Sequence, residues 1–322
     1  MTIASLISVV LLAAVLWQVD FFKLAIIAKN LKPSFFLLAL ITLPLEIFLK
    51  AVRLKVMTET QSKITFTNSL VVTLIGLPLG MVTPGRFGDF IKLDALSRRT
   101  SLPLMKSFSV GVMEKILDFF SLLALTFTGI IVLVIKGREE KIFFCIIFFV
   151  IAMAVFVAAV LNRNLTEKIF KYFLEKLGPA GLKSQVEDYL AGFYSGISAI
   201  AGKNKALSSS LLLAFLLWFN RILRIFFVAL SLGLKIRLEY LFLIVPVIDV
   251  VEIMPLSIMG LGTREYAYIF LLSLIGISRE ESLALSLLAF LLVAVSFSFA
   301  GYLAIMKEYG KSFKEKLVVG NK

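Results

Sequence analysis

The chain has 322 residues and a mean hydropathy of +0.98, with 60% hydrophobic residues and only 17% charged ones, whereas soluble domains carry about a quarter charged residues. This composition excludes an ordinary soluble protein and indicates a membrane protein. The 34 Lys and Arg residues outnumber the 21 Asp and Glu residues, and the absence of histidine excludes Ser-His-Asp and Cys-His catalysis and histidine-ligated zinc or haem.

The chain contains a single cysteine, Cys145, within an apolar run. One cysteine can form neither an internal disulfide nor a cysteine-based metal site, so we expect no metal and no cofactor. The net charge of +13 fits basic loops gathered on one side of a membrane, and we expect no nucleic-acid partner.

Six long apolar segments each predict a membrane-spanning helix, because crossing about 30 Å of hydrocarbon takes roughly 20 helical residues. They are residues 3–19, 34–49, 116–135, 142–161, 207–232 and 283–306. The first segment has no basic residue before it and no small-residue cleavage site after it, so we interpret it as a retained helix and not as a cleaved signal peptide.

Two further apolar regions, residues 67–97 and 240–277, are interrupted by glycine and proline. Each is divided into two pieces that are too short to cross a membrane comfortably. We expect each region to form a re-entrant helical hairpin, which enters and leaves the membrane on one side and keeps its irregular tip inside the protein. A pair of kinked ordinary spans is the alternative interpretation.

The order of span, hairpin and span therefore occurs twice, in opposite directions across the membrane. This order predicts an all-α inverted repeat. The expected parts are an N-terminal membrane half at residues 1–161, a cytoplasmic connector at 162–206, and a C-terminal membrane half with a basic tail at 207–322.

Lys and Arg are concentrated in the segments that this topology leaves on one side, including the predicted loop at residues 50–66 and the connector. Basic loops stay in the cytoplasm, so we expect a multi-pass protein of the cell membrane with both termini in the cytoplasm. The connector contains a basic amphipathic piece at 168–177 and an apolar stripe at 182–200. Both suit helices on the inner membrane surface, and a hairpin that packs only on the protein is the alternative.

Many charged residues fall at membrane depth in this topology, where each costs a few kcal/mol unless it is paired or hydrated. They are Glu46, Arg86, Asp89, Glu114, Lys115, Asp118, Arg221, Arg224, Asp249, Glu252, Arg264 and Glu265. They could neutralise one another as structural clamps, for instance Arg86 with Asp118 or Arg264 with Glu252. We favour a hydrated functional cavity, because helix packing alone needs only small or apolar side chains.

The two hairpin tips share a chemical pattern. The first contains Pro84-Gly85-Arg86-x-Gly88-Asp89, and the second contains Gly260-x-Gly262-x-Arg264-Glu265. Each motif stands just before a predicted helix, so free backbone N–H groups, the positive end of the helix dipole and an arginine converge there. The pattern predicts an anion site, and the anion that reaches the middle of a membrane most simply is a lipid head group.

These motifs, together with Glu114-Lys115-x-x-Asp118 and Pro255-x-Ser257, resemble the lysylphosphatidylglycerol synthase transmembrane region family, which includes the flippase domain of the multiple peptide resistance factor. The resemblance covers essentially the whole chain and implies a lipid-translocating membrane domain. Mild departures from the family pattern occur at Asp89, Lys92, Lys115 and Thr263. The soluble aminoacyl-transferase domain of two-function members has no counterpart before the last residue, Lys322, so we expect a transporter without synthase activity.

We therefore expect a flippase-like transporter of a phospholipid or of a polyprenyl-phosphate-linked lipid. Arg86 and Arg264 are expected to hold the phosphate, while Asp118, Asp249 and Glu252 pair with them, bind a cationic head group or exchange protons. The expected substrate-binding residues are Gly85, Arg86, Gly88, Asp89, Glu114, Asp118, Arg221, Arg224, Asp249, Glu252, Gly260, Gly262, Arg264 and Glu265.

Two alternatives belong to other functional classes. The first is an integral-membrane enzyme that acts on lipid phosphates, with Asp249 and Glu252 as oxygen ligands of Mg²⁺. The second is a non-transporting subunit that anchors a synthase or glycosyltransferase partner through the basic connector.

Overall fold

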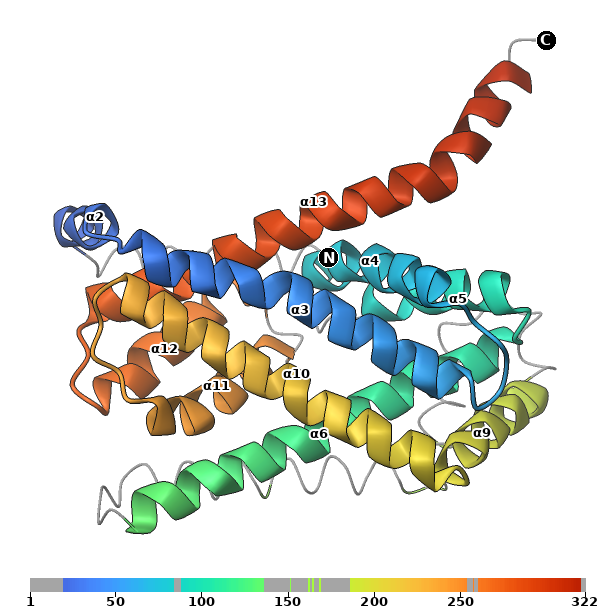
Figure 1. Cartoon of the computed structure of the whole chain (residues 1–322), viewed down its shortest axis with the longest axis horizontal. Helices are drawn as coiled ribbons and strands as arrows, with labels where there is room; N and C mark the ends of the chain where they lie inside the picture. The colour runs from blue at the N-terminus through green and yellow to red at the C-terminus, as the bar shows by residue number, and fades with distance from the viewer. Residues whose placement is uncertain are drawn as a thin grey trace.

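The computed structural model of the chain describes residues 20–83, 88–135, 186–253, 257 and 260–319, and residues 151, 162, 164 and 168 individually. Within these residues the regular structure is helical (Figure 1). The helices are α2 (Phe21–Lys29), α3 (Pro33–Thr58), α4 (Phe66–Val82), α5 (Lys92–Thr100), α6 (Leu104–Ile135), α9 (Val186–Ala201), α10 (Asn204–Ser231), α11 (Leu238–Ile253), α12 (Thr263–Ser273) and α13 (Arg279–Val319).

Four described helices are long and apolar enough to cross a membrane: α3, α6 over Leu104–Val132, α10, and α13 over Arg279–Met306. They confirm four of the six predicted spans. The other two predicted spans, 3–19 and 142–161, lie outside the described residues apart from residue 151, which is helical.

The predicted ends of two spans were wrong, because charged residues were interpreted as the start of a loop. Helix α3 continues to Thr58 and includes most of the predicted loop at 50–66. Helix α6 begins at Leu104, well before residue 116. In both helices the charged side chains find partners inside the bundle, so the helix does not have to end where they begin.

Four shorter helices, α4, α5, α11 and α12, occupy the two regions predicted as hairpins. The Thr65 hydroxyl caps the start of α4 by accepting the Asn68 N–H at 3.2 Å. Between α11 and α12, Gly260 and Gly262 have φ values of 69° and 83°, a conformation that glycine adopts at little cost. The two pairs of short helices are present as predicted. That each pair enters and leaves the membrane on one side stays a prediction.

The helices occur twice in the order long, short, short, long: α3, α4, α5, α6 and then α10, α11, α12, α13. Helix α3 packs along α10 (Figure 1) and runs antiparallel to it. At one end of this pair the Lys32 N–H donates to the Ser231 carbonyl at 2.7 Å, and further along the Asn220 amide donates to the Thr42 carbonyl at 2.9 Å.

Two further contacts between the two sets are reciprocal. Helix α4 packs on α13, and its counterpart α11 packs on α6. A glycine lies at each of these crossings: a Cβ at Gly301 would overlap Pro78 of α4, and a Cβ at Gly129 would press on Leu243 of α11. Small residues allow helices to approach closely in membranes. In both crossings, a glycine on the long helix allows this close approach.

Two apolar clusters form the core. One cluster lies mainly among α10, α11, α12 and α13 and includes Ile222 and Leu241; the other lies mainly among α3, α4, α5 and α6 and includes Leu54 and Leu93. The outward faces are also apolar, as at Ile41 and Phe299. Exposed apolar bands on long helices match the hydrocarbon of a bilayer.

Helix α9 belongs to the predicted connector and packs on α6 and α10. Its Ile200 is fully buried and Ile197 is partly buried in the second cluster. These two residues of the apolar stripe therefore contact the protein, and the position of the connector relative to the membrane surface stays a prediction. Helix α10 begins at Asn204, within the predicted connector. Toward the C-terminus, α13 continues beyond the helix bundle (Figure 1).

Candidate functional site

Most of the described charged side chains that were predicted at membrane depth border two polar cavities, one associated mainly with each set of helices. Cavity 1 has a volume of about 50 Å³ and lies among α10, α11, α12, α13 and the end of α4. Cavity 2 has a volume of about 80 Å³ and lies among α3, α4, α5, α6 and α10. Arg221 borders both cavities.

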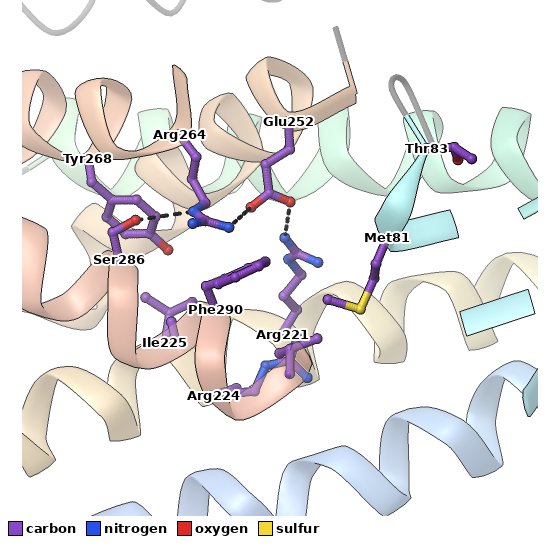
Figure 2. Close-up of a pocket in the computed structure, with 12 residues that line it drawn as sticks. Met81, Thr83, Arg221, Arg224, Ile225, Glu252, Arg264, Tyr268, Ser286 and Phe290 are labelled. Carbon is purple, nitrogen blue, oxygen red and sulfur yellow. Dashed lines mark hydrogen bonds and ion pairs between the residues drawn. The ribbon is translucent and has the colours of Figure 1, made fainter. Parts of the chain in front are cut away.

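Cavity 1 is lined by residues from both halves of the chain (Figure 2). Its lining consists of Met81, Thr83, Arg221, Arg224, Ile225, Glu252, Arg264, Tyr268, Ser286, Ala289, Phe290 and Val293. The charged members are three arginines and one glutamate, so cationic groups predominate on the surface of this cavity. Hydroxyl groups, aromatic rings and aliphatic side chains complete the lining.

Arg264 is held from several sides. Its Nε donates to the Ser286 hydroxyl at 3.2 Å, a terminal nitrogen donates to Glu265, and the guanidinium lies 4.1 Å from the centre of the Phe290 ring. Such cation–π contacts and charge-assisted hydrogen bonds fix the plane of a guanidinium. The side chain is 3% exposed, so Arg264 is already positioned toward cavity 1.

Glu265 caps the start of α12. Its second carboxylate oxygen accepts the Gly262 N–H at 2.6 Å, which satisfies a free backbone donor at the helix start. One tip amide that the sequence predicted for phosphate is therefore bonded to Glu265 in this structure. Of the groups that the sequence predicted to bind phosphate at this tip, the Arg264 side chain supplies the positive charge.

Glu252 lies between two arginines (Figure 2). One carboxylate oxygen accepts from Arg221 at 3.0 Å, and the other lies 4.0 Å from Arg264. Arg221 also forms an ion pair with Asp249, which is 2% exposed. The predicted proximity of Arg264 and Glu252 is present, and Arg221 joins the same cluster.

Arg224, the neighbouring arginine on α10, is directed toward α3. It pairs with Glu46, which also binds Lys50 at 2.7 Å. Arg224 and Glu46 are both buried. This cross-helix pair fixes α3 against α10 beside cavity 1, and Glu46 itself borders cavity 2.

Cavity 2 contains a network of ion pairs. Arg53 donates to both carboxylate oxygens of Asp118, at 2.5 and 3.3 Å, and its Nε lies 3.7 Å from Glu114. Lys92 donates to Glu114 at 2.7 Å. The Trp218 indole of α10 donates to Asp118 at 3.2 Å, so this network reaches the helix that carries Arg221.

A second pair in cavity 2 ties the region after the first tip to α6. Lys115 donates to Asp89 at 2.8 Å. Near the same tip, the Gly88 N–H donates to the Thr83 hydroxyl at 2.6 Å. The hydroxyl of Thr73, another buried residue that lines this cavity, makes no protein hydrogen bond.

Arg53 was missed as a candidate by the sequence analysis, which placed it in a cytoplasmic loop. It is 3% exposed within α3. The sequence does contain a signal, since Glu46, Lys50 and Arg53 are spaced four and three residues apart and so share one face of a helix. Asp118 pairs with Arg53, while Arg86, the partner suggested for it, lies outside the described residues.

The other predicted residues divide between the two cavities. Asp89, Glu114 and Asp118 border cavity 2, and Arg224, Glu252 and Arg264 border cavity 1. Asp249, Gly260, Gly262 and Glu265 support the second cluster through the contacts given above, and Gly260 lies against Glu252. Gly85 and Arg86 lie outside the described residues.

Long apolar helices around buried, paired charges define the class of this protein as a multi-pass α-helical membrane protein. The chain belongs to the lysylphosphatidylglycerol synthase TM region family, whose sequence model matches residues 1–301. It is also similar to the UPF0104 membrane protein PH1989 of Pyrococcus horikoshii, with 23% identity over 302 residues, which cover 88% of this chain and 90% of that protein.

Proposed function

We propose that this protein is a lipid transporter of the flippase type, which moves a phosphate-bearing lipid from one leaflet of the membrane to the other without covalent chemistry. The observation that carries the proposal is the cluster of Arg221, Arg224 and Arg264 around cavity 1. Arginine binds phosphate with two parallel hydrogen bonds. Family membership and the membrane-spanning helices support a lipid as the source of that phosphate.

The carboxylates around the cluster have a defined task in this proposal. Glu46, Asp249 and Glu252 neutralise the arginines while no substrate is bound, because unpaired charges inside a membrane are costly. An arriving phosphate replaces a carboxylate as the partner of an arginine. This exchange keeps the charges paired throughout the transport cycle.

The architecture proposed for transport is the inverted repeat with two re-entrant hairpins. The reciprocal contacts of α4 with α13 and of α11 with α6 support it, since transporters of this design move one repeat against the other around a central site. Cavity 1, at about 50 Å³, is large enough for only a few water molecules. A head group therefore enters only when the helices around the cavity separate, so the described arrangement is a closed state of the proposed cycle.

The enzyme alternative depends on Asp249 and Glu252 as metal ligands. Both carboxylates contact Arg221, and a guanidinium competes with a cation for the same oxygens. This arrangement favours a transport role for the pair.

Lipid movement in proteoliposomes tests the proposal. A head-group-labelled fluorescent phospholipid and a membrane-impermeant quencher report the rate of exchange between leaflets. We expect the wild-type protein to accelerate exchange and Arg264→Gln to slow it about tenfold, the effect of losing about 1.4 kcal/mol from a charge-assisted contact. Arg237→Gln is the matched control, because Arg237 lies on the surface beside Glu239 and such pairs contribute little.

The experiment tests the transport function and the assigned binding site separately. A wild-type protein that leaves exchange at the rate of empty liposomes contradicts the transport proposal. Transport that persists unchanged in a folded Arg264→Gln protein contradicts the assigned site alone.

A further inference from the structure

An apolar groove of about 350 Å³ lies between α11 and α12. Val247 and Val251 form the α11 side, and Tyr266, Ala267 and Phe270 form much of the α12 side. Arg264 and Tyr268, which line cavity 1, belong to a different face of α12. Helix α12 therefore has a polar cavity against one face and an apolar groove against another.

The groove faces the surroundings of the protein. Tyr266 is 64% exposed and Phe270 is 47% exposed. In a multi-pass membrane protein, apolar side chains that are exposed on a membrane-embedded helix contact lipid. The medium that meets this groove is accordingly hydrocarbon.

The size of the groove suits a hydrocarbon chain. An engineered apolar cavity of about 150 Å³ accepts benzene, which has six carbon atoms. A groove of about 350 Å³ therefore accommodates a section of an acyl or isoprenoid chain of about a dozen carbon atoms. Its length runs along α12, from Thr263 to Leu271.

The groove ends next to the predicted phosphate site. Thr263, at this end of the groove, shares a hydrogen bond of 2.8 Å with Ser257 and donates to the Gly260 carbonyl at 3.1 Å. The next residue in the chain is Arg264, whose guanidinium faces cavity 1. The first turn of α12 thus places Thr263 at the end of the groove and the Arg264 guanidinium at cavity 1.

We propose that this groove is the binding site for a hydrocarbon chain of the same lipid whose phosphate binds in cavity 1. The inference rests on the proposed function and extends it, because it selects an amphiphilic substrate over a free phosphate ion. The lipid chain lies along α12 between Val251 and Phe270, and the head group passes the tip at Thr263 to reach Arg264.

Photocrosslinking in proteoliposomes tests the proposal independently of transport. The probe is a phosphatidylglycerol with a diazirine in the middle of one acyl chain, and adducts are located by mass spectrometry of peptides. We expect adducts to be concentrated on residues 263–271. Val251→Trp fills the groove and is expected to lower this labelling about tenfold, whereas Leu212→Trp, at an exposed position of α10, leaves it unchanged.

Val247→Trp repeats the test at the other end of the α11 side of the groove, in case the larger side chain at Val251 impairs folding. Labelling that is spread evenly over the exposed apolar helices, or that neither valine variant lowers, overturns the groove as a chain site.

Arg264→Gln tests the link to cavity 1. We expect it to lower labelling by the phosphate-bearing probe and to leave labelling by a diazirine-bearing diacylglycerol unchanged. If Arg264→Gln changes the labelling by both probes to the same extent relative to the wild-type protein, the link is overturned. A protein that shows groove labelling sensitive to Val251→Trp but no lipid exchange contradicts the proposed function and retains the groove as a lipid site.

Discussion

Arg221 connects the two cavities through its contacts. Its guanidinium binds Asp249 and Glu252 on α11 and lies 5.7 Å from the centre of the Trp218 ring. Trp218 in turn donates to Asp118, the partner of Arg53. A chain of adjacent side chains therefore runs from cavity 2 to cavity 1.

Arg53 provides the sharpest test at the scale of a residue. Arg53→Gln removes the cation that pairs with Asp118 at 2.5 Å and leaves Glu114 with Lys92 alone, and breaking a buried ion pair costs about 3–5 kcal/mol. We expect a large decrease in the free energy of unfolding, measured by titration with denaturant in detergent micelles. The control Lys55→Gln removes an exposed pair with Glu59, worth less than about 1 kcal/mol. Equal effects of the two substitutions would show that Arg53 is not buried in the network.

The sequence predicted most of the charged residues of the site and the pair of Arg264 with Glu252, but not the other pairs. Hydropathy and spacing identify Glu114, Asp249 and Arg264 as charges within apolar helices. The partner of each charge depends on how the helices rotate and pack, which periodicity alone does not determine. Asp118 illustrates the point, because its partner Arg53 is 65 residues away and stands beyond the predicted end of its helix.

At the scale of helices, hydropathy predicted the four spans that the structure describes and failed at the ends of two of them. Windows of apolar residues identify α3, α6, α10 and α13 because the hydrocarbon thickness sets a minimum length. The ends of α3 and α6 depend on whether a charged side chain meets a partner or water. The positions of the short helices were predicted well, since Gly260 and Gly262 interrupt the helix through backbone conformation alone.

The crossing of α4 and α13 supplies a prediction about helix packing. Gly301→Val places a side chain against Pro78 and the α4 backbone, and overpacking of this kind costs about 1–3 kcal/mol. We expect a lower midpoint of thermal unfolding in detergent. Ser298→Val, at an exposed position on the same helix, is expected to leave the midpoint unchanged. A stable Gly301→Val protein would contradict the close approach of the two helices.

At the scale of the whole molecule, the two cavities are displaced toward opposite ends of the bundle. Cavity 2 is bordered by the second half of α3 and the first part of α6, and cavity 1 by the second half of α10 and the first part of α13. Helices α3 and α10 are antiparallel. The second halves of these two helices therefore point to opposite ends, and so do the cavities.

This arrangement predicts that the two cavities are reached by water from opposite sides of the membrane. In a Cys145→Ser background, Thr73→Cys reports cavity 2 and Ala289→Cys reports cavity 1. A membrane-impermeant thiol reagent is expected to modify Thr73→Cys from the cytoplasmic side and Ala289→Cys from the outer side, because the proposed inverted repeat and the expected orientation open each half toward its own side. Leu212→Cys, at an exposed apolar position, is expected to react from neither side. Modification of both cavity positions from one side would contradict an alternating path and would place both cavities in a single vestibule.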